Sequence, residues 1–218
     1  HLSEPLVKEK TGMGHEQLGM KKIQSGEIAE ALSANGFSPA ELLKAMRGPM
    51  DAVISSAFGT DRIDYLLRDA HFTGVSYSIV DAERLLQSFA FDGGKLVLEE
   101  KGLLAAESLL VSRYLMFRAV YNHHANRIAS KMLENALRIA LDDGKITVAG
   151  IADGNDYSVL FSLQGEPLVQ RILSRRLFKT AFACKETLPA RRLEAELLKE
   201  FRRDEFAVCD AGESLASA

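Results

Sequence analysis

The stretch DRIDYLLRDAHFTGV, residues 61–75, predicts an amphipathic helix around which the rest of the chain is organised. Successive residues of an α-helix are rotated by about 100°, which separates this stretch into an apolar face and a polar face. Thr60 is expected to cap the helix and Gly74 to end it. The apolar face comprises Ile63, Leu66, Leu67 and Ala70, and the polar face comprises Asp61, Asp64, Tyr65, Arg68, Asp69 and Phe72.

The polar face has two interpretations. It could be a solvated surface braced by pairs such as Asp64 with Arg68. Written as DxxDYxxRDxxxxGV, however, the segment resembles the last conserved motif of the HD-domain phosphohydrolases, in the branch of the deoxynucleoside triphosphate triphosphohydrolases (dGTPase-like). This resemblance implies a mainly α, HD-type helical fold with a small β-hairpin and a mixed α/β C-terminal part.

Bulk properties restrict the function classes. A chain of 218 residues with 47% hydrophobic residues can bury a sizeable core. The net charge of −3 gives no basic field, so nucleic-acid binding is not expected. Cys184 and Cys209 lack metal-ligand spacing, and a reduced cytoplasmic location is expected. The apolar runs are shorter than the ~20 residues of a membrane span.

Residue patterns predict mostly helices. Alternating residues around Asp92-Gly93-Gly94 predict a hairpin at 89–98, and 103–142 predicts two helices, or one bent helix, with a junction near 122–126. We expect residues 1–143 to be part of the phosphohydrolase domain and 144–218 to serve oligomerisation. Further expectations are a loop at 1–13, helices near 14–24, 26–34, 39–46, 79–87, 157–163, 167–175 and 189–202, a break at 144–151, a strand at 177–184 and a frayed tail at 210–218.

The resemblance implies a divalent metal, of the group Mg, Mn, Fe, Ni or Zn, held by a His, an adjacent His-Asp pair and a later Asp. Asp61 matches the later Asp, but the chain has no His-Asp dipeptide. The other ligands therefore precede His1, or this is a copy of the fold without its metal. The first alternative is favoured because the chain does not begin with Met and residues 1–4 resemble the end of the metal-binding segment. With one ligand, the segment alone is expected to be inactive.

Two further groups of residues resemble elements of the same family. Gly14-His15-Glu16 resembles a Thr/Gly-His-Glu element, which implies that His15 donates a proton or stabilises charge at the phosphate and that Glu4 orients a histidine. Without the resemblance, His15 would be a surface or capping residue.

Arg113, Phe117 and Tyr121 recur every four residues and so predict a stripe on one helix. Arg-x7-Tyr-x-His, ending at His123, resembles the substrate-contacting helix of the family. Arg113 would then hold a phosphate and Tyr121 the sugar. The alternative is a core helix whose aromatic stripe simply packs, with two histidines at a bend.

On the motif helix, the resemblance implies that Arg62 contacts the phosphates, Tyr65 the sugar and Asp69 the 3′-hydroxyl. The expected function is metal-dependent hydrolysis of a dNTP to deoxynucleoside and triphosphate. The alternatives are an HD phosphohydrolase for another phosphate ester and a non-catalytic nucleotide-binding or assembly module. A homo-oligomer is expected. A basic cluster could bind an effector nucleotide or nucleic acid, or be a solvated helix face, and it comprises Arg171, Arg175, Arg176 and Lys179.

Overall fold

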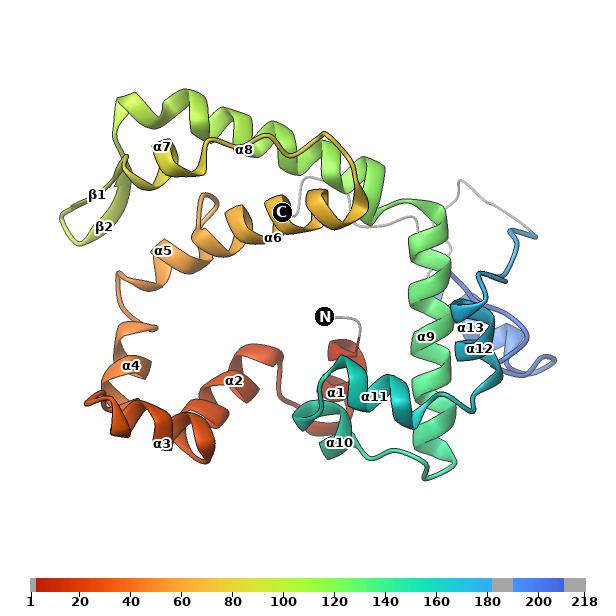
Figure 1. The fold of residues 1–218 in the computed structure, drawn as a ribbon. Helices are drawn as coiled ribbons and strands as arrows, with labels where there is room; N and C mark the ends of the chain where they lie inside the picture. Colours follow the sequence, from red (N-terminus) through yellow and green to blue (C-terminus); the bar gives the residue numbers. More distant parts are fainter. Residues whose placement is uncertain (1–2, 182–189, 210–218) are drawn as a thin grey trace. The chain divides into compact units, whose positions relative to one another are not determined.

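The structure, a computed structural model, describes residues 3–181 and 190–209 (Figure 1). It divides into two compact units, which we call the central unit (residues 19–121) and the terminal unit (residues 1–18 and 122–218). Most described residues are helical and one antiparallel hairpin is present, which confirms the predicted fold class. Within the described ranges, no helix combines the length and hydropathy needed to cross a bilayer.

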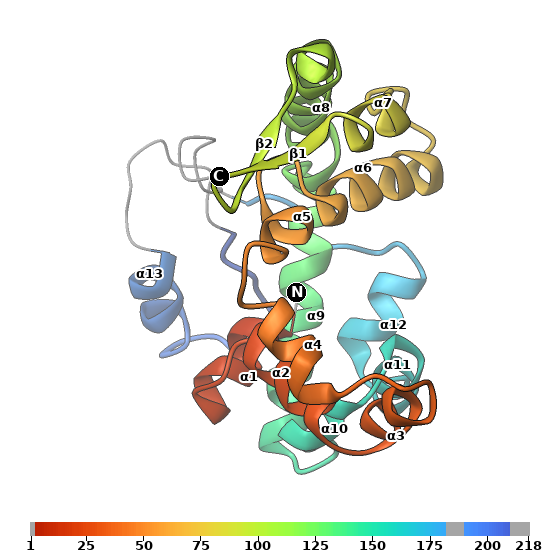
Figure 2. The same cartoon turned by 90° about the vertical axis from the view of Figure 1, so that its left-hand side faces the viewer.

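The central unit is a series of helices interrupted by the hairpin. The two strands of the hairpin pair antiparallel, with Phe89 opposite Leu98, and they connect the helix at 82–86 to the helix at 103–116 (Figure 2). The elements are α2 (His15–Gln24, which begins in the terminal unit), α3 (Glu27–Ala34), α4 (Pro39–Ala45), α5 (Asp51–Ser55), α6 (Thr60–Thr73), α7 (Ala82–Leu86), β1 (Phe89–Asp92), β2 (Lys95–Leu98), the 3₁₀ turn η1 (Glu100–Gly102), α8 (Leu103–Met116) and the π-helical turn η2 (Phe117–Tyr121).

Helix α6 is the predicted amphipathic helix. Ile63, Leu66 and Ala70 are buried in a core shared with α8. Gly74 ends the helix with a left-handed φ of 70°, as predicted. Two details of the prediction were wrong. The N-cap residue is Gly59, without a side-chain cap, and Leu67 is 36% exposed because it lies at the edge of the apolar face.

Gly59 allows the turn before α6 to close tightly. A Cβ atom at this position would lie 2.0 Å from the carbonyl oxygen of Ile54, which belongs to the backbone and cannot rotate away. We expect Gly59→Ala to lower the free energy of unfolding of the central unit by about 1–3 kcal/mol. The check is hydrogen exchange of α6 amides. As a control, Gly19→Ala has open space inside α2 and should be neutral or stabilising; equal losses in both variants would contradict the explanation.

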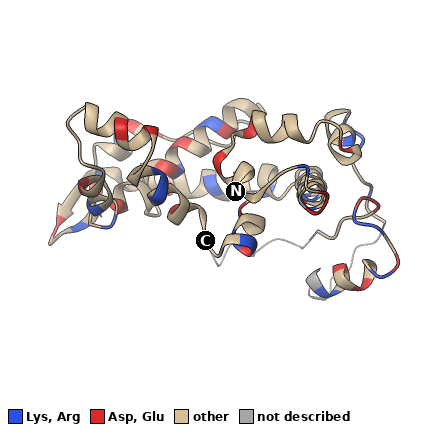
Figure 3. Cartoon of the chain, turned by 90° about the horizontal axis from the view of Figure 1, so that it is seen from below, with Lys and Arg blue, Asp and Glu red and all other residues tan. Residues whose placement is uncertain are grey.

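The terminal unit is built around the long helix α9. Its buried side chains Met132, Ala136 and Leu137 pack with Leu6 of α1 and Leu168 of α12 in one core. The helices are α1 (Glu4–Thr11), α9 (His124–Asp142), α10 (Val148–Asp153), α11 (Asp156–Ser162), α12 (Pro167–Leu173) and α13 (Ala190–Leu197). Basic and acidic segments are interspersed along the chain, as the small net charge indicates (Figure 3).

Three predictions for the terminal unit were wrong. Residues 4–11 form a helix rather than a loop, because Pro5 fits a first helical turn and Leu6 and Val7 are buried. The expected break at 144–151 ends early, since Thr147 caps α10 by accepting a hydrogen bond from the Gly150 amide at 3.0 Å. Residues 177–181 form no strand, whereas 182–184 lie outside the described residues.

Other predicted boundaries shift or stay untested. The helix expected at 189–202 ends at Leu197. The predicted tail at 210–218 lies outside the described residues. The division into a catalytic part and an oligomerisation part at residue 143 stays a prediction, because the two compact units describe packing and not function.

Candidate functional site

The central unit brings together the polar face of α6 and the π-helical turn η2 that follows α8. Tyr121 donates a hydrogen bond from its hydroxyl to Oδ2 of Asp69 at 2.6 Å. The rings of Tyr65 and Tyr121 meet edge to face, with centroids 6.2 Å apart. Burial, and then the Asp69 carboxylate, raise the pKa of Tyr121 far above its ordinary value. The hydroxyl therefore stays protonated and acts as a donor at neutral pH.

Arg113 extends this group along α8. Its guanidinium carbon lies 5.3 Å from the centre of the Phe117 ring, and Phe117 packs on Tyr121 with centroids 5.1 Å apart. These three side chains form the stripe that their spacing predicts. Nε of Arg113 is buried and has no hydrogen-bond partner within the described residues. A buried donor without an acceptor costs about 1–3 kcal/mol, so the site favours an added acceptor such as a phosphate oxygen.

We call Tyr65, Asp69, Arg113, Phe117 and Tyr121 the α6–η2 cluster. It combines a cation, a carboxylate and aromatic faces in one half-buried place. These are the groups that bind the phosphate, hydroxyl and sugar portions of a nucleotide. Four residues that the sequence singles out as substrate contacts therefore lie close together in this cluster: Tyr65, Asp69, Arg113 and Tyr121.

Asp61 and Arg62 lie in the first turn of α6, about 12 Å and about 10 Å along the helix axis from Asp69 at about 1.5 Å per residue. Asp61 is exposed and Arg62 is half-buried. Among the described residues, no three His, Cys, Asp or Glu side chains are arranged to hold a metal ion. Asp61 can thus supply at most one ligand, and the described residues do not form a metal centre by themselves. Arg68 pairs with Asp64 at 2.7 Å and braces the helix.

The terminal unit contains the second group of predicted residues. Nδ1 of His15 lies 2.5 Å from Oε1 of Glu4, so Glu4 orients His15 itself. The His15 side chain is 58% exposed and can reach a ligand. The hydrogen bond from His15 lowers the pKa of the Glu4 carboxyl below its ordinary value. This pair is a carboxylate–histidine dyad of the kind used in proton transfer.

The depressed pKa of Glu4 predicts a pH dependence. The contact stabilises the folded state above the carboxyl's ordinary pKa of 4.5 and loses this effect as the pH falls through the lower folded value. We expect His15→Ala to raise the pKa of Glu4 toward its ordinary value, measured by carboxyl ¹³C NMR titration. Glu16→Gln, which changes a neighbouring exposed acid, should leave it unchanged. An unaltered Glu4 titration in His15→Ala would show that the dyad does not form in solution.

His123 has a structural role. Its Nδ1 accepts a hydrogen bond from the Ala125 amide at 3.3 Å and thereby caps α9, and its ring lies against His124 with centroids 4.4 Å apart. Contact of His123 with substrate stays a prediction. In the basic cluster, Arg171 lies over the Phe178 ring at 4.7 Å and donates to the Arg176 carbonyl. The effector site also stays a prediction.

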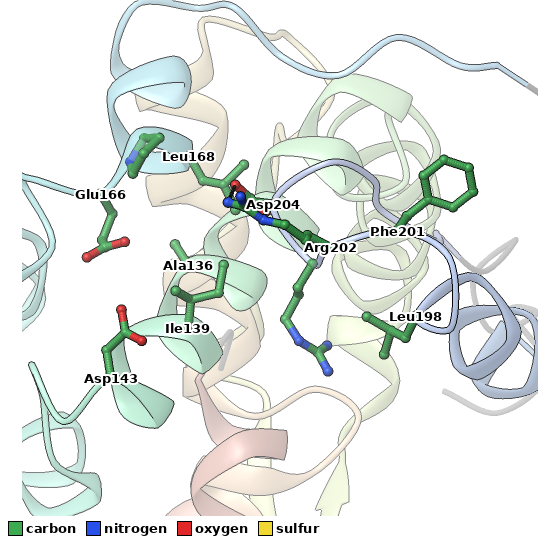
Figure 4. A pocket seen from close by; sticks show the side chains of 11 residues that line it. Ala136, Ile139, Asp143, Glu166, Leu168, Leu198, Phe201, Arg202 and Asp204 are labelled. Carbon is green, nitrogen blue, oxygen red and sulfur yellow. Dashed lines mark hydrogen bonds and ion pairs between the residues drawn. The ribbon is translucent and has the colours of Figure 1, made fainter.

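A pocket of about 510 Å³ opens in the terminal unit between α9, α12 and residues 198–204 (Figure 4). It contains none of the predicted site residues. Its charged side chains are already paired, for example Arg202 with Asp204 at 2.6 Å and Glu166 with Lys145 at 2.7 Å. The pocket therefore offers no spare charge to a ligand. A second pocket of about 790 Å³, beside α4 in the central unit, also contains none of them.

The sequence interpretation overlooked Asn135. This buried side chain donates to the carbonyl oxygens of Arg203 and Phe206, each at 3.0 Å, and so holds the segment after α13 against α9. The signal that could have found it is an amide within the apolar face of α9.

Comparison with known proteins decides the family. A family model described as the HD associated region matches residues 80–212, which is well over half of the chain. The chain belongs to the HD-associated region family. It is 33% identical over 176 residues to an uncharacterized protein of Methanocaldococcus jannaschii, covering 77% of this chain and 38% of that protein. An uncharacterized protein of Bacillus subtilis is 30% identical over 156 residues, 59% of this chain and 36% of that protein.

The chain spans well under half the length of these curated relatives. Among solved structures, a phosphohydrolase from Bacteroides thetaiotaomicron matches with a TM-score of 0.66 and 18% identity, over 88% of this chain and 58% of that one. A hypothetical protein from Aquifex aeolicus matches with a TM-score of 0.70 and 30% identity, over 92% of this chain and 58% of that one. This member of the HD-associated region family thus has a phosphohydrolase-like fold.

Proposed function

We propose that this chain is the nucleotide-positioning part of an HD-type phosphohydrolase that cleaves a deoxynucleoside triphosphate to deoxynucleoside and triphosphate. The observation that carries the proposal is the α6–η2 cluster, in which the buried Nε of Arg113 has no acceptor among the residues that the structure describes and Tyr121 donates to Asp69. The phosphohydrolase-like fold supports the reaction class. The dNTP substrate rests on the resemblance of the DxxDY motif.

Within the cluster, each side chain has a separate task. Arg113 binds a phosphate through its guanidinium group, and Arg62 adds a second cation from the start of α6. Tyr65 and Tyr121 pack against the sugar. Asp69 uses one carboxylate oxygen for Tyr121. Its other oxygen is then available to accept from the 3′-hydroxyl of a nucleotide.

The Glu4–His15 dyad supplies the proton chemistry. His15 protonates or stabilises the departing oxygen, and Glu4 holds the imidazole in position. The dyad belongs to the terminal unit and the cluster to the central unit.

A divalent metal is implied by the family resemblance and would polarise phosphate oxygens and acidify a water molecule. The described residues do not form its site, because Asp61 is the one predicted ligand among them and no donor cluster surrounds it. The binding and proton-transfer roles described in the two preceding paragraphs are roles of side chains in this chain and not of the metal.

The test is an assay of the intact protein with each dNTP and Mg²⁺ or Mn²⁺, with ³¹P NMR to identify the phosphorus-containing product. Release of triphosphate supports the proposal. Orthophosphate released from a nucleoside monophosphate would instead assign another substrate class. Bound nucleotide without turnover would favour the non-catalytic module.

A further inference from the structure

The pocket of about 790 Å³ beside α4 in the central unit carries positive charge. Ala40, Leu43 and Lys44 lie on one side of α4 and line the pocket, and Arg47 follows in the next turn. The Arg47 amide donates to the Lys44 carbonyl oxygen at 3.3 Å. In such an i to i+3 turn the two side chains project from the same side. Among the described residues that line the pocket, these two are charged and none is acidic.

Neither cation is neutralised by an acid of the chain. Lys44 forms no ion pair with any residue in the ranges 3–181 and 190–209. Arg47 contacts the uncharged sulfur of Met20 through Nη2 at 3.5 Å and has no carboxylate partner in those ranges. In the pocket between α9 and α12, by contrast, the charged side chains are already paired with opposite charges. The pocket beside α4 thus holds two cations that the described residues leave uncompensated.

An exposed cation is hydrated and does not by itself indicate a ligand. Lys44 and Arg47, however, project from the same side of one turn, where like charges repel each other, and both line a concave surface. An anion between them would replace this repulsion by two charge-assisted hydrogen bonds. The arrangement therefore favours a negatively charged ligand.

The remaining lining suits the rest of such a ligand. Ser38 precedes α4, but its hydroxyl makes no capping hydrogen bond, so it can donate to a ligand. The side-chain amide of Gln24 adds a second neutral donor from the end of α2. Leu43 is 6% exposed and, with Pro39 and Ala40, provides an apolar surface.

We propose that this pocket binds a small organic phosphate, with its phosphate group between Lys44 and Arg47 and its organic part against Leu43. A phosphate monoester has three terminal oxygens and about two negative charges, so it can accept from both cations and from Ser38 together. A carboxylate has two oxygens and one charge. A cavity of about 790 Å³ exceeds a phosphate ion and is typical of sites for small organic ligands.

This inference does not depend on the proposed dNTP reaction, because the pocket contains none of the residues assigned to that reaction. Its test is a titration of the intact protein with phenyl phosphate without divalent metal, followed by ¹³C-methyl NMR of Ala40 and Leu43. We expect saturable shifts of these signals with a Kd of about 0.1–1 mM at low ionic strength. Shifts that do not saturate would overturn the proposal.

Charge removal locates the phosphate group. Lys44→Gln and Arg47→Gln should each raise the Kd at least about fivefold, because each removes a charge-assisted hydrogen bond. Lys95→Gln removes one positive charge from the exposed hairpin of the same unit and should change the Kd by less than about twofold. An unaltered Kd in both pocket variants would overturn the site. Circular dichroism of the variants excludes unfolding as the cause, since Lys44 and Arg47 are exposed.

Two further arms test the ligand class and the location. Benzoate has the same ring with a carboxylate and should bind at least about fivefold more weakly than phenyl phosphate. Equal binding of benzoate would contradict the phosphate assignment. Phenyl phosphate can also reach Arg113 of the α6–η2 cluster, so the titration is repeated with Arg113→Gln. Persistence of the Ala40 and Leu43 shifts supports a separate pocket, whereas their loss would assign them to the cluster and overturn the proposal.

Discussion

Tyr121→Phe is expected to lower kcat/KM of the intact protein for its nucleotide by about ten- to a hundredfold. The change removes a hydroxyl whose 2.6 Å bond orients the Asp69 carboxylate. A hydrogen bond to a charged group contributes about 1.5–3 kcal/mol, which corresponds to that range of rate. Because the aromatic ring remains, its packing on Phe117 and Tyr65 is retained, and the free energy of unfolding should fall by no more than the about 1.5–3 kcal/mol of the lost hydrogen bond.

Steady-state kinetics with both kcat and KM resolved is the measurement. The matched control is Tyr77→Phe, which removes an exposed hydroxyl in the same unit and should alter neither constant more than about twofold. Should Tyr121→Phe behave like this control, the α6–η2 cluster would be a packing feature and not a substrate site.

Leu66→Ala is expected to destabilise the central unit by about 2–5 kcal/mol. Leu66 is fully buried, with 0% exposure, at the contact of α6 with α8, and its removal leaves a cavity as well as losing apolar burial. The variant should also lose nucleotide binding, because α6 carries Tyr65 and Asp69. Hydrogen exchange of α6 amides, together with nucleotide titration, measures both effects.

Leu67→Ala is the control on the same helix. Leu67 is 36% exposed, so the same truncation should cost less than about 1 kcal/mol. A loss as large as that of Leu66→Ala would mean that Leu67 is covered by another part of the intact protein.

Periodicity predicted the fold wherever one helix face is strongly apolar. The pattern of α6 assigned Leu66 to the core and Gly74 to the end of the helix, and both assignments are confirmed. It failed where tertiary contacts decide. Leu6 and Val7 form a helix because they pack against α9, a partner more than a hundred residues away that local sequence does not reveal.

The candidate site was partly predictable for the same reason. The spacing of Arg113, Phe117 and Tyr121 indicated a stripe because it is a property of one helix. The bond between Tyr121 and Asp69 joins two helices and depends on their packing, which spacing does not encode. The pocket between α9, α12 and residues 198–204 was missed because its lining comes from segments far apart in the sequence.

The two ends of the chain build the terminal unit, whereas the central unit is one uninterrupted segment, and this order affects biosynthesis. Residues 19–121 have emerged from the ribosome before α9 is made, so the central unit can fold during translation. Helix α1 can pack against α9 only after α9 has been made. In the folded chain Glu9 of α1 forms an ion pair with Arg138 of α9, with 3.0 Å between the nitrogen and oxygen atoms. Until α9 has been made, Leu6 and Val7 of α1 therefore lack the core in which the folded chain buries them.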